Sequence, residues 1–443
     1  AEYDTWALDP RRFGPHATVE WTALKAIEDY QNEFRFHRPH EHRPAGRRVR
    51  TTPLTPLLEA AGAEFGVVNG WERALFYKPR PDFAETHSFG WCASHPIVAQ
   101  EVAAVQERVG IMEVSGFTRF AAAGSGVRDW LDGLMAGRVP KRAGKVGLAY
   151  FLTEAGNVAG EVTIALLDET TAWIGSAAAA EIHDRDWFSE RVPAEGGIQM
   201  TPLTETHTIL VVAGPRARDV MAAAAPRTDW SAQAFPWLSV RRVHIGPVAA
   251  VAMSVSYSGE LAYEIHVPLP QAEAAYRAVM AAGAAHGITH FGLHAAESMR
   301  IEKGFRHWKA DLITEFDPFE SGLDRFVDLG KQSFPGRAAL LARRNTPPRG
   351  AFVTLRLESD RAPAHPGDCV LLGERVIGSI TSAAWGHRVG ENLAMAFLDP
   401  AQAPNGRAME ALPLVDVLVL GERLPARIVS PARYDPEMTR PRA

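Results

Sequence analysis

Runs of apolar residues at helical or alternating spacing divide the first 290 residues into short helices and strands. The predicted helices cover residues 23–36, 54–61, 98–109, 127–135, 217–224 and 271–286, and Ser125 is the expected cap of the fourth. The predicted strands cover residues 117–122, 148–152, 161–166, 208–213, 248–257 and 263–267. Segments 115–190 and 208–290 repeat one plan of strand, helix and hairpin, which indicates an internal duplication.

The pattern changes after Arg349, where short strands alternate with glycine and proline turns. The predicted strands cover residues 351–357, 369–372, 375–382, 392–398, 414–419 and 423–428. Regularly spaced short strands without long helices are typical of a small β-barrel or sandwich. We therefore expect an α+β domain at 51–345 and a C-terminal β-barrel domain at 346–443, after an N-terminal extension, residues 1–50.

Composition narrows the class of protein. The 443 residues are 46% hydrophobic and 22% charged with a formal net charge of −5, which argues against nucleic acid as a partner. No apolar run approaches the ~20 residues that span a bilayer. Cys92 and Cys369 form no CxxC pair, so we expect a reduced, cytoplasmic protein. A solvated cluster accounts for the histidines of HRPHEHRPAGRR, residues 37–48, and no metal site is expected.

The stretch SYSGELAYEIHV, residues 256–267, carries the strongest candidate chemistry. It places Tyr257, a glycine turn and two glutamates, Glu260 and Glu264, at the mouth of an apolar strand. An inward-facing carboxylate needs a partner, and the two parallel N–H donors of a pterin would suit it as arginine does. The alternative for Glu264 is an outward-facing strand residue, and for Tyr257 an aromatic packed across the hairpin.

Other candidate residues have both a structural and a functional interpretation. Glu161 opens the strand GEVTIALL, where it is either a strand-edge residue or a catalytic carboxylate. In the helix ESMRIEK, residues 297–303, the charges are spaced for a structural ion pair about Arg300. Trp71 and Trp385 stand at predicted turns and are either core residues or walls of a cofactor groove.

Together these motifs resemble the aminomethyltransferase (glycine cleavage T-protein) family, closest to the C-terminal folate-binding half of dimethylglycine and sarcosine dehydrogenases. The segments WALDPRRFG, NGWERALFY, SFGW, TSAAWGHRVGENLAMAFLD and YDPEMTR extend the resemblance over nearly the whole chain. It implies an α+β fold, in which a duplicated folate-binding domain is followed by the β-barrel. It also implies that Glu264 holds the pterin of tetrahydrofolate, that Glu161 moves a proton near N5 and N10, and that Tyr257 lies beside them.

The chain departs from the family pattern at two of these positions. Relatives usually carry aspartate where Glu161 stands, so proton transfer here depends on a side chain one methylene longer. Ala296 stands where the aminomethyltransferase has an arginine that meets the folate tail, so other residues must hold the tail.

The resemblance implies a tetrahydrofolate-dependent one-carbon transferase subunit of a system that demethylates an N-methyl amine. It would capture iminium or formaldehyde carbon as 5,10-methylenetetrahydrofolate. The flavin domain that precedes WALDPRRFG in relatives is not in this sequence, so we expect an FAD-containing amine dehydrogenase subunit as partner. One alternative is flavin-independent transfer of a methyl group from an O-, S- or N-methyl donor. Another is a non-catalytic folate-binding module, although KQSFPGR, residues 331–337, lacks the cysteine of such relatives.

Overall fold

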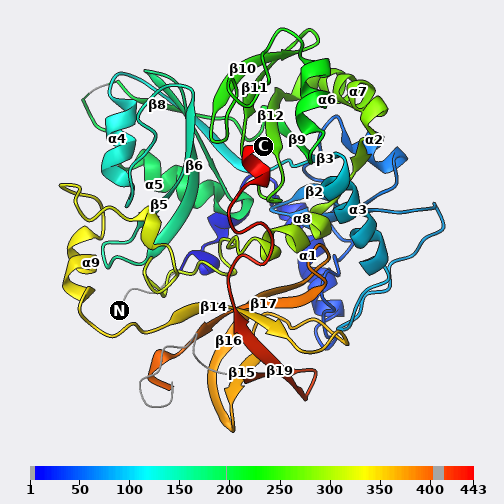
Figure 1. Cartoon of the computed structure of the whole chain (residues 1–443), viewed down its shortest axis with the longest axis vertical. Helices are drawn as coiled ribbons and strands as arrows, with labels where there is room; N and C mark the ends of the chain where they lie inside the picture. Colours follow the sequence, from blue (N-terminus) through cyan, green and yellow to red (C-terminus); the bar gives the residue numbers. More distant parts are fainter. Residues whose placement is uncertain (1–4, 196, 403–413) are drawn as a thin grey trace.

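The computed structural model describes residues 5–195, 197–402 and 414–443. Figure 1 shows two α+β lobes side by side, with a β-barrel below them and the C-terminal segment rising from the barrel between the lobes. Within the described residues, no helix combines the length and the apolar content needed to cross a bilayer.

The first lobe is a sheet with the strand order β5-β6-β7-β4-β8, with helices against one face. Its elements are β4 Thr118–Ala123, α4 Val127–Leu134, β5 Lys145–Leu152, β6 Val158–Asp168, β7 Thr171–Ser176, α5 Glu181–Ser189 and β8 Gln199–Pro202. Alternate strand residues such as Val162 and Ile164 fill the core beside Leu131 of α4 and Phe188 of α5. The expected strands and helix of this lobe are present, but Gly126 caps α4, and the expected cap Ser125 does not.

The second lobe is a sheet with the strand order β10-β11-β12-β9-β3-β13. Its elements are β3 Gly110–Glu113, β9 His207–Ala213, α6 Ala217–Ala224, β10 Val240–Ile245, β11 Val248–Met253, β12 Ala262–Pro268, α7 Ala272–Gly283 and β13 Thr289–His290. Before it come α1 Val19–Gln31, α2 Thr55–Ala60, β1 Ala63–Val68, β2 Trp71–Tyr77 and α3 His95–Glu107. The expected strand 248–257 is too long, because β11 ends at Met253 and the chain then leaves the sheet as a loop.

The two lobes repeat one topology. In each, a strand leads through a glycine with positive φ, Gly124 or Gly214, into a helix that begins three residues later. The strand order β5-β6-β7-β4 of the first lobe corresponds to β10-β11-β12-β9 of the second. The duplication indicated by the sequence is therefore present in the fold.

Superposing these repeated strands by their pairing gives residue equivalences. Ala121 of β4 pairs with Trp173, and Val211, the equivalent residue of β9, pairs with Glu264. Trp173 therefore occupies in the first lobe the position that Glu264 occupies in the second. On the next strand, Ala165 of β6 pairs with Trp173 and Met253 of β11 pairs with Glu264, so Ala165 and Met253 are equivalent. Four residues earlier on each strand, Ala249 of β11 is the equivalent of Glu161 on β6.

The C-terminal region forms the expected barrel, closed in the order β14-β17-β16-β15-β18-β19. Its strands are β14 Ala351–Leu357, β15 Cys369–Leu372, β16 Arg375–Gly386, β17 Glu391–Leu398, β18 Val415–Val419 and β19 Glu422–Val429. Helices α8 Leu293–Glu302 and α9 Arg337–Arg343 lie on the connection from the second lobe, and α8 packs on β16. Residues 403–413, in the last part of this region, lie outside the described residues.

Candidate functional site

Glu161 and Glu264 project from the facing sides of the two sheets. On β6, Glu161 lies on the same side as Ala165, and on β12, Glu264 is paired with Met253 of β11. Ala165 and Met253 pack into one apolar cluster between the sheets. Because side chains alternate along a strand, both carboxylates face the space between the lobes. Glu161 and Glu264, both predicted from the sequence, thus lie on opposite walls of this space.

Glu161 has a hydrogen-bond donor on the neighbouring strand. The hydroxyl of Tyr150, its partner residue on β5, donates to Oε2 of Glu161 over 2.6 Å. Burial raises the pKa of Glu161 to about 7, while Tyr150 and the positive charge of Arg306 oppose that rise. A carboxyl group that is half ionised near neutral pH can both accept and return a proton. Glu161 is therefore suited to general acid–base chemistry.

Tyr257 lies in the loop between β11 and β12, beside the same space. Burial raises its pKa, and the charged groups that act on it are Arg300, Glu297, Asp311 and Glu161. The residue is nevertheless 42% exposed. Tyr257 is therefore an accessible residue among charged side chains that include Glu161 of β6 and Glu297 of α8. We call the space bordered by Glu161, Tyr257 and Glu297 the central recess.

The floor of the central recess is a buried ion network on α8. Arg300 is fully buried and pairs with Glu297, as the helical spacing predicts, and with Asp311 over 2.7 Å. Although burial opposes the change, Arg300 lowers the pKa of Glu297. Asp311 also accepts hydrogen bonds from Thr381 over 2.5 Å and Ser382 over 2.7 Å, both on β16. The network therefore joins the helix, the recess and the barrel.

A second buried network fixes the loop that carries Tyr257. Glu260 is ion-paired with Arg388, which follows β16, over 2.9 Å. The same guanidinium pairs with Glu302 and lies 3.9 Å from the centre of the Tyr434 ring. Glu260, Glu302 and Arg388 have side chains that are at most 1% exposed. Glu260 is thus a structural residue that ties the loop to the barrel.

Glu264 keeps free hydrogen-bonding capacity. Its side chain is 30% exposed, and the contact given by the structure is 3.5 Å from Oε2 to Nε2 of His266. Arg119 of β4 lies close enough for the charge of Glu264 to act on it, and burial lowers the pKa of Arg119 to about 10. Within the described chain, Nε and Nη1 of Arg119 have no hydrogen-bond partner. This end of the space between the lobes therefore contains polar groups with hydrogen-bonding capacity that the described residues do not use.

The two predicted tryptophans occupy different environments. Trp71 is 2% exposed and packs between the guanidinium of Arg50, 4.5 Å from its ring, and the backbone of Gly116. Trp385 is partly buried on β16, where its carbonyl accepts a 2.7 Å hydrogen bond from Ser298 of α8 and its ring meets Trp91 edge-on. Trp385 thus adjoins the floor of the recess, whereas Trp71 is in the packed interior.

Histidines gather in a small cavity of about 60 Å³ behind α8, lined in part by His40, His42, His87 and His294. The ring of His40 lies 4.7 Å from that of His294, and Nδ1 of His42 accepts a hydrogen bond from Val67. The expectation of a solvated cluster is therefore wrong for His42. Among the described residues, no group of three or more His, Cys, Asp and Glu side chains is placed to hold a metal ion.

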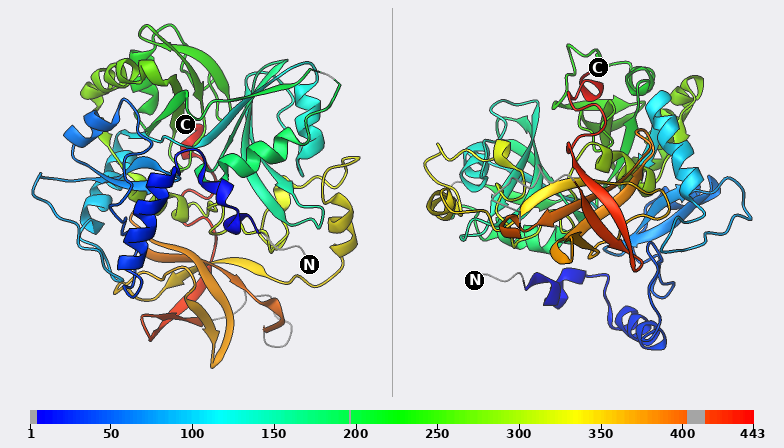
Figure 2. Two further views of the ribbon diagram at one scale, coloured as in Figure 1. Left: turned by 180° about the vertical axis from the view of Figure 1, so that it is seen from behind. Right: turned by 60° about the horizontal axis from the view of Figure 1, so that its bottom comes forward.

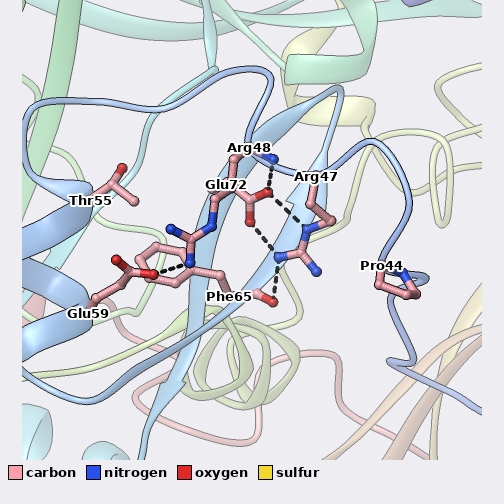
Figure 3. A pocket seen from close by; sticks show the side chains of 7 residues that line it. All are labelled: Pro44, Arg47, Arg48, Thr55, Glu59, Phe65 and Glu72. Atoms are coloured by element: carbon pink, nitrogen blue, oxygen red, sulfur yellow. Dashed lines mark hydrogen bonds and ion pairs between the residues drawn. The ribbon is translucent and has the colours of Figure 1, made fainter. Parts of the chain in front are cut away.

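A larger cleft of about 270 Å³ lies away from both carboxylates, between the N-terminal segment and α2. Figure 3 shows that its charged lining residues are already paired, Arg47 with Glu72 and Arg48 with Glu59. Because these guanidinium groups are neutralised, the cleft offers no free charge to a ligand. The central recess remains the better candidate site.

Sequence reasoning did not single out Tyr150, Arg306, Asp311 or Arg388. Tyr150 could have been found, since a hairpin predicted over 148–166 places it opposite Glu161. Arg306 and Asp311 lie in the irregular segment after α8, and Arg388 follows β16, so no periodic spacing identifies them.

Comparison with known proteins gives matches over both domains. The GCVT N-terminal domain matches residues 54–331, and the Glycine cleavage T-protein C-terminal barrel domain matches residues 351–435. Residues 1–52 match the FAD dependent oxidoreductase central domain.

The chain is similar to mitochondrial dimethylglycine dehydrogenase of Rattus norvegicus, with 31% identity over 99% of this chain and 51% of the relative. It is also similar to mitochondrial sarcosine dehydrogenase of Mus musculus, with 27% identity over 91% of this chain and 48% of the relative. The chain therefore spans about half the length of these relatives. The crystal structure of glycine cleavage system aminomethyltransferase T from Bartonella henselae has the same fold, with a TM-score of 0.73 and 21% identity over 87% of this chain and 98% of that one.

Proposed function

This chain belongs to the glycine cleavage T-protein (aminomethyltransferase) family, and we propose that it is a tetrahydrofolate-dependent one-carbon transferase. The proposed reaction takes the carbon of an N-methyl group, as an iminium or as formaldehyde, and yields 5,10-methylenetetrahydrofolate. The proposed partner is an FAD-containing amine dehydrogenase that oxidises an amine of the dimethylglycine or sarcosine kind. The observation that carries the proposal is the pair of glutamates, Glu161 and Glu264, on facing walls of one space.

The residues present fit a reduced pterin. Glu264 is partly exposed and has acceptor capacity left for the 2-amino group and the adjacent ring N–H. Tyr257 offers an accessible aromatic ring in the central recess. The backbone of Trp385 is hydrogen-bonded to α8 beside this floor, and its ring, which meets Trp91 and His95, is the proposed outer wall. Trp71, packed under Arg50, would act only through the residues around it.

In the proposed mechanism the folate, when bound, supplies the nitrogen nucleophiles that take up the carbon. Two protons would be released as the carbon is taken up, and two would go to the departing amine of an iminium or to the departing oxygen of formaldehyde. Glu161, with a pKa of about 7, accepts and returns them at the mouth of the recess. Glu297, held ionised by Arg300, stabilises positive charge on the incoming carbon.

The test is anaerobic calorimetry of the purified chain with tetrahydrofolate. We expect 1:1 binding that Glu264→Gln weakens at least tenfold, because the amide replaces one acceptor oxygen by a donor that faces the pterin N–H groups. Glu273→Gln is the matched control, since Glu273 lies on the outer surface of α7 in an exposed pair with Arg277. Equal binding by the Glu264 variant and the wild type would refute the assignment.

A second measurement separates the proposed reaction from direct methyl transfer. With tetrahydrofolate and formaldehyde alone, the chain should speed formation of 5,10-methylenetetrahydrofolate, identified by mass spectrometry. Formation of 5-methyltetrahydrofolate from a methyl donor, with no oxidant added, would replace our proposal by the alternative.

A further inference from the structure

Helix α1 carries its apolar face on the outside of the molecule. Its inward side is polar: Lys25 pairs with Glu28 over 3.0 Å, and the indole N–H of Trp21 donates to the carbonyl of Gly46. The outward side and the turn that follows it bear large apolar residues. These are Val19, Leu24, Ile27, Tyr30, Phe34 and Phe36, with exposed fractions of 82, 52, 56, 79, 94 and 87%.

This arrangement is the reverse of what a surface helix needs. An amphipathic helix that packs on a domain turns its apolar stripe inward, because burial of that stripe is the main source of its stability. Leu24, Ile27 and Tyr30 follow one another at helical spacing and therefore form one continuous stripe. The right-hand view of Figure 2 shows α1 at the edge of the molecule, and the exposed fractions place the stripe on its outward side. Contiguous exposed apolar surface of this kind marks an interaction site.

We propose that this outward stripe, the α1 face, is the docking surface for a flavin-dependent oxidoreductase domain or subunit. The occupant is indicated by residues 1–52, which include α1 and match the FAD dependent oxidoreductase central domain, whereas the domains after residue 54 match the T-protein family. A helix that belongs to the central domain of a flavoprotein turns its apolar side toward the remainder of that domain. This inference rests on the proposed function, because it specifies where the oxidising partner binds.

The same segment also leads into the proposed site. His40 and His42, which follow α1, line the small cavity with His294 of α8. The charge of Glu297 acts on His40, and Glu297 borders the central recess. The N-terminal segment therefore runs from the α1 face toward the central recess. A partner bound to the α1 face would lie on that side of the molecule.

The experiment uses the 443-residue chain, tagged at its C-terminus and produced in its source cells. We expect the wild type to copurify with a flavoprotein and to release FAD in about equimolar amount. The variant Leu24→Glu/Ile27→Glu/Tyr30→Glu should lose at least nine-tenths of that FAD, because three charges would be buried in an apolar contact. Val376→Glu is the matched control, since Val376 is a 58% exposed apolar residue of the barrel and should leave FAD unchanged.

Two results would overturn the inference: a wild type that carries no flavin, or a triple variant that keeps it. A wild type that light scattering finds as a dimer, and that the triple variant makes monomeric, would assign the α1 face to a second copy of this chain instead. Tetrahydrofolate binding is measured on the same samples. In the triple variant, loss of FAD with folate binding retained supports the docking surface. In the wild type, FAD without folate binding would refute the proposed function and leave the docking surface standing.

Discussion

The hydroxyl of Tyr150 donates a 2.6 Å hydrogen bond to Glu161 from the neighbouring strand. Because that bond favours the ionised carboxylate, it holds the pKa of Glu161 lower than burial alone would set it. Tyr150→Phe should therefore shift the midpoint of the pH–rate profile for carbon transfer upward from near pH 7 by about one unit, the scale of a hydrogen bond to a charged group. Phe326→Leu, a change beside the Tyr150 ring that leaves the bond in place, is the control. An unchanged midpoint in Tyr150→Phe would show that Glu161 does not govern the profile.

Glu161→Gln should lower activity and raise stability at alkaline pH. The folded state raises the pKa of Glu161 above its usual value of about 4.5, to about 7, so its cost to stability grows as pH rises between those values and is complete above them. The amide can still accept the bond from Tyr150 and has no charge to desolvate. We expect about 1–3 kcal/mol more stability at pH 8 and little change at pH 4.5, with carbon transfer reduced about 10²–10⁴-fold. Urea unfolding at pH 8 and at pH 4.5 measures the expected change in stability.

Arg388 should be costly to replace. Its removal leaves Glu260 and Glu302 buried without a counter-charge, which typically destabilises a protein by about 3–5 kcal/mol. Arg388→Met should therefore lower the free energy of unfolding by that amount, while the further changes Glu260→Gln and Glu302→Gln recover part of it. If the three changes added independently, the network would not act as a unit.

Acidification should destabilise the chain through His294. Burial lowers the pKa of His294 to about 3, below the usual value of about 6.5, so unfolding takes up a proton between those values and stability falls as pH decreases. The expected loss at pH 5, relative to pH 8, is at most about 2 kcal/mol from this residue. His294→Gln should remove this contribution, so that thermal stability falls less between pH 8 and pH 5 than it does in the wild type. His244→Gln, on an exposed position of β10, should not.

Most of the fold follows from periodicity because each lobe and the barrel bury one face of a sheet. Alternate residues such as Val162 and Ile164 must then be apolar, and the pattern is visible in the sequence. The prediction for β11 was wrong at its end for a physical reason. Val255 is apolar because it packs between the lobes, not because it belongs to the strand.

The candidate site was predictable where it depends on one strand or one helix. The alternation around Glu264 and the i,i+3 spacing of Glu297 and Arg300 are local, and both have the geometry expected. Asp311 and Arg388 could not be predicted, since Asp311 reaches Arg300 from the irregular segment after α8 and Arg388 reaches Glu302 from 86 residues away. Whether Trp71, Trp385 and Tyr257 contact a cofactor stays a prediction.

The equivalence of Trp173 with Glu264, and of Ala249 with Glu161, bears on how such a centre arose. Two identical halves related by a twofold axis would carry a glutamate at both equivalent positions or at neither, so an acid present in one half alone would not occur. One glutamate in each half, at positions that are not equivalent, became possible only after fusion allowed the two halves to change separately. Ancestral halves reconstructed as a self-associating dimer should accordingly fold and carry any carboxylate at both equivalent positions.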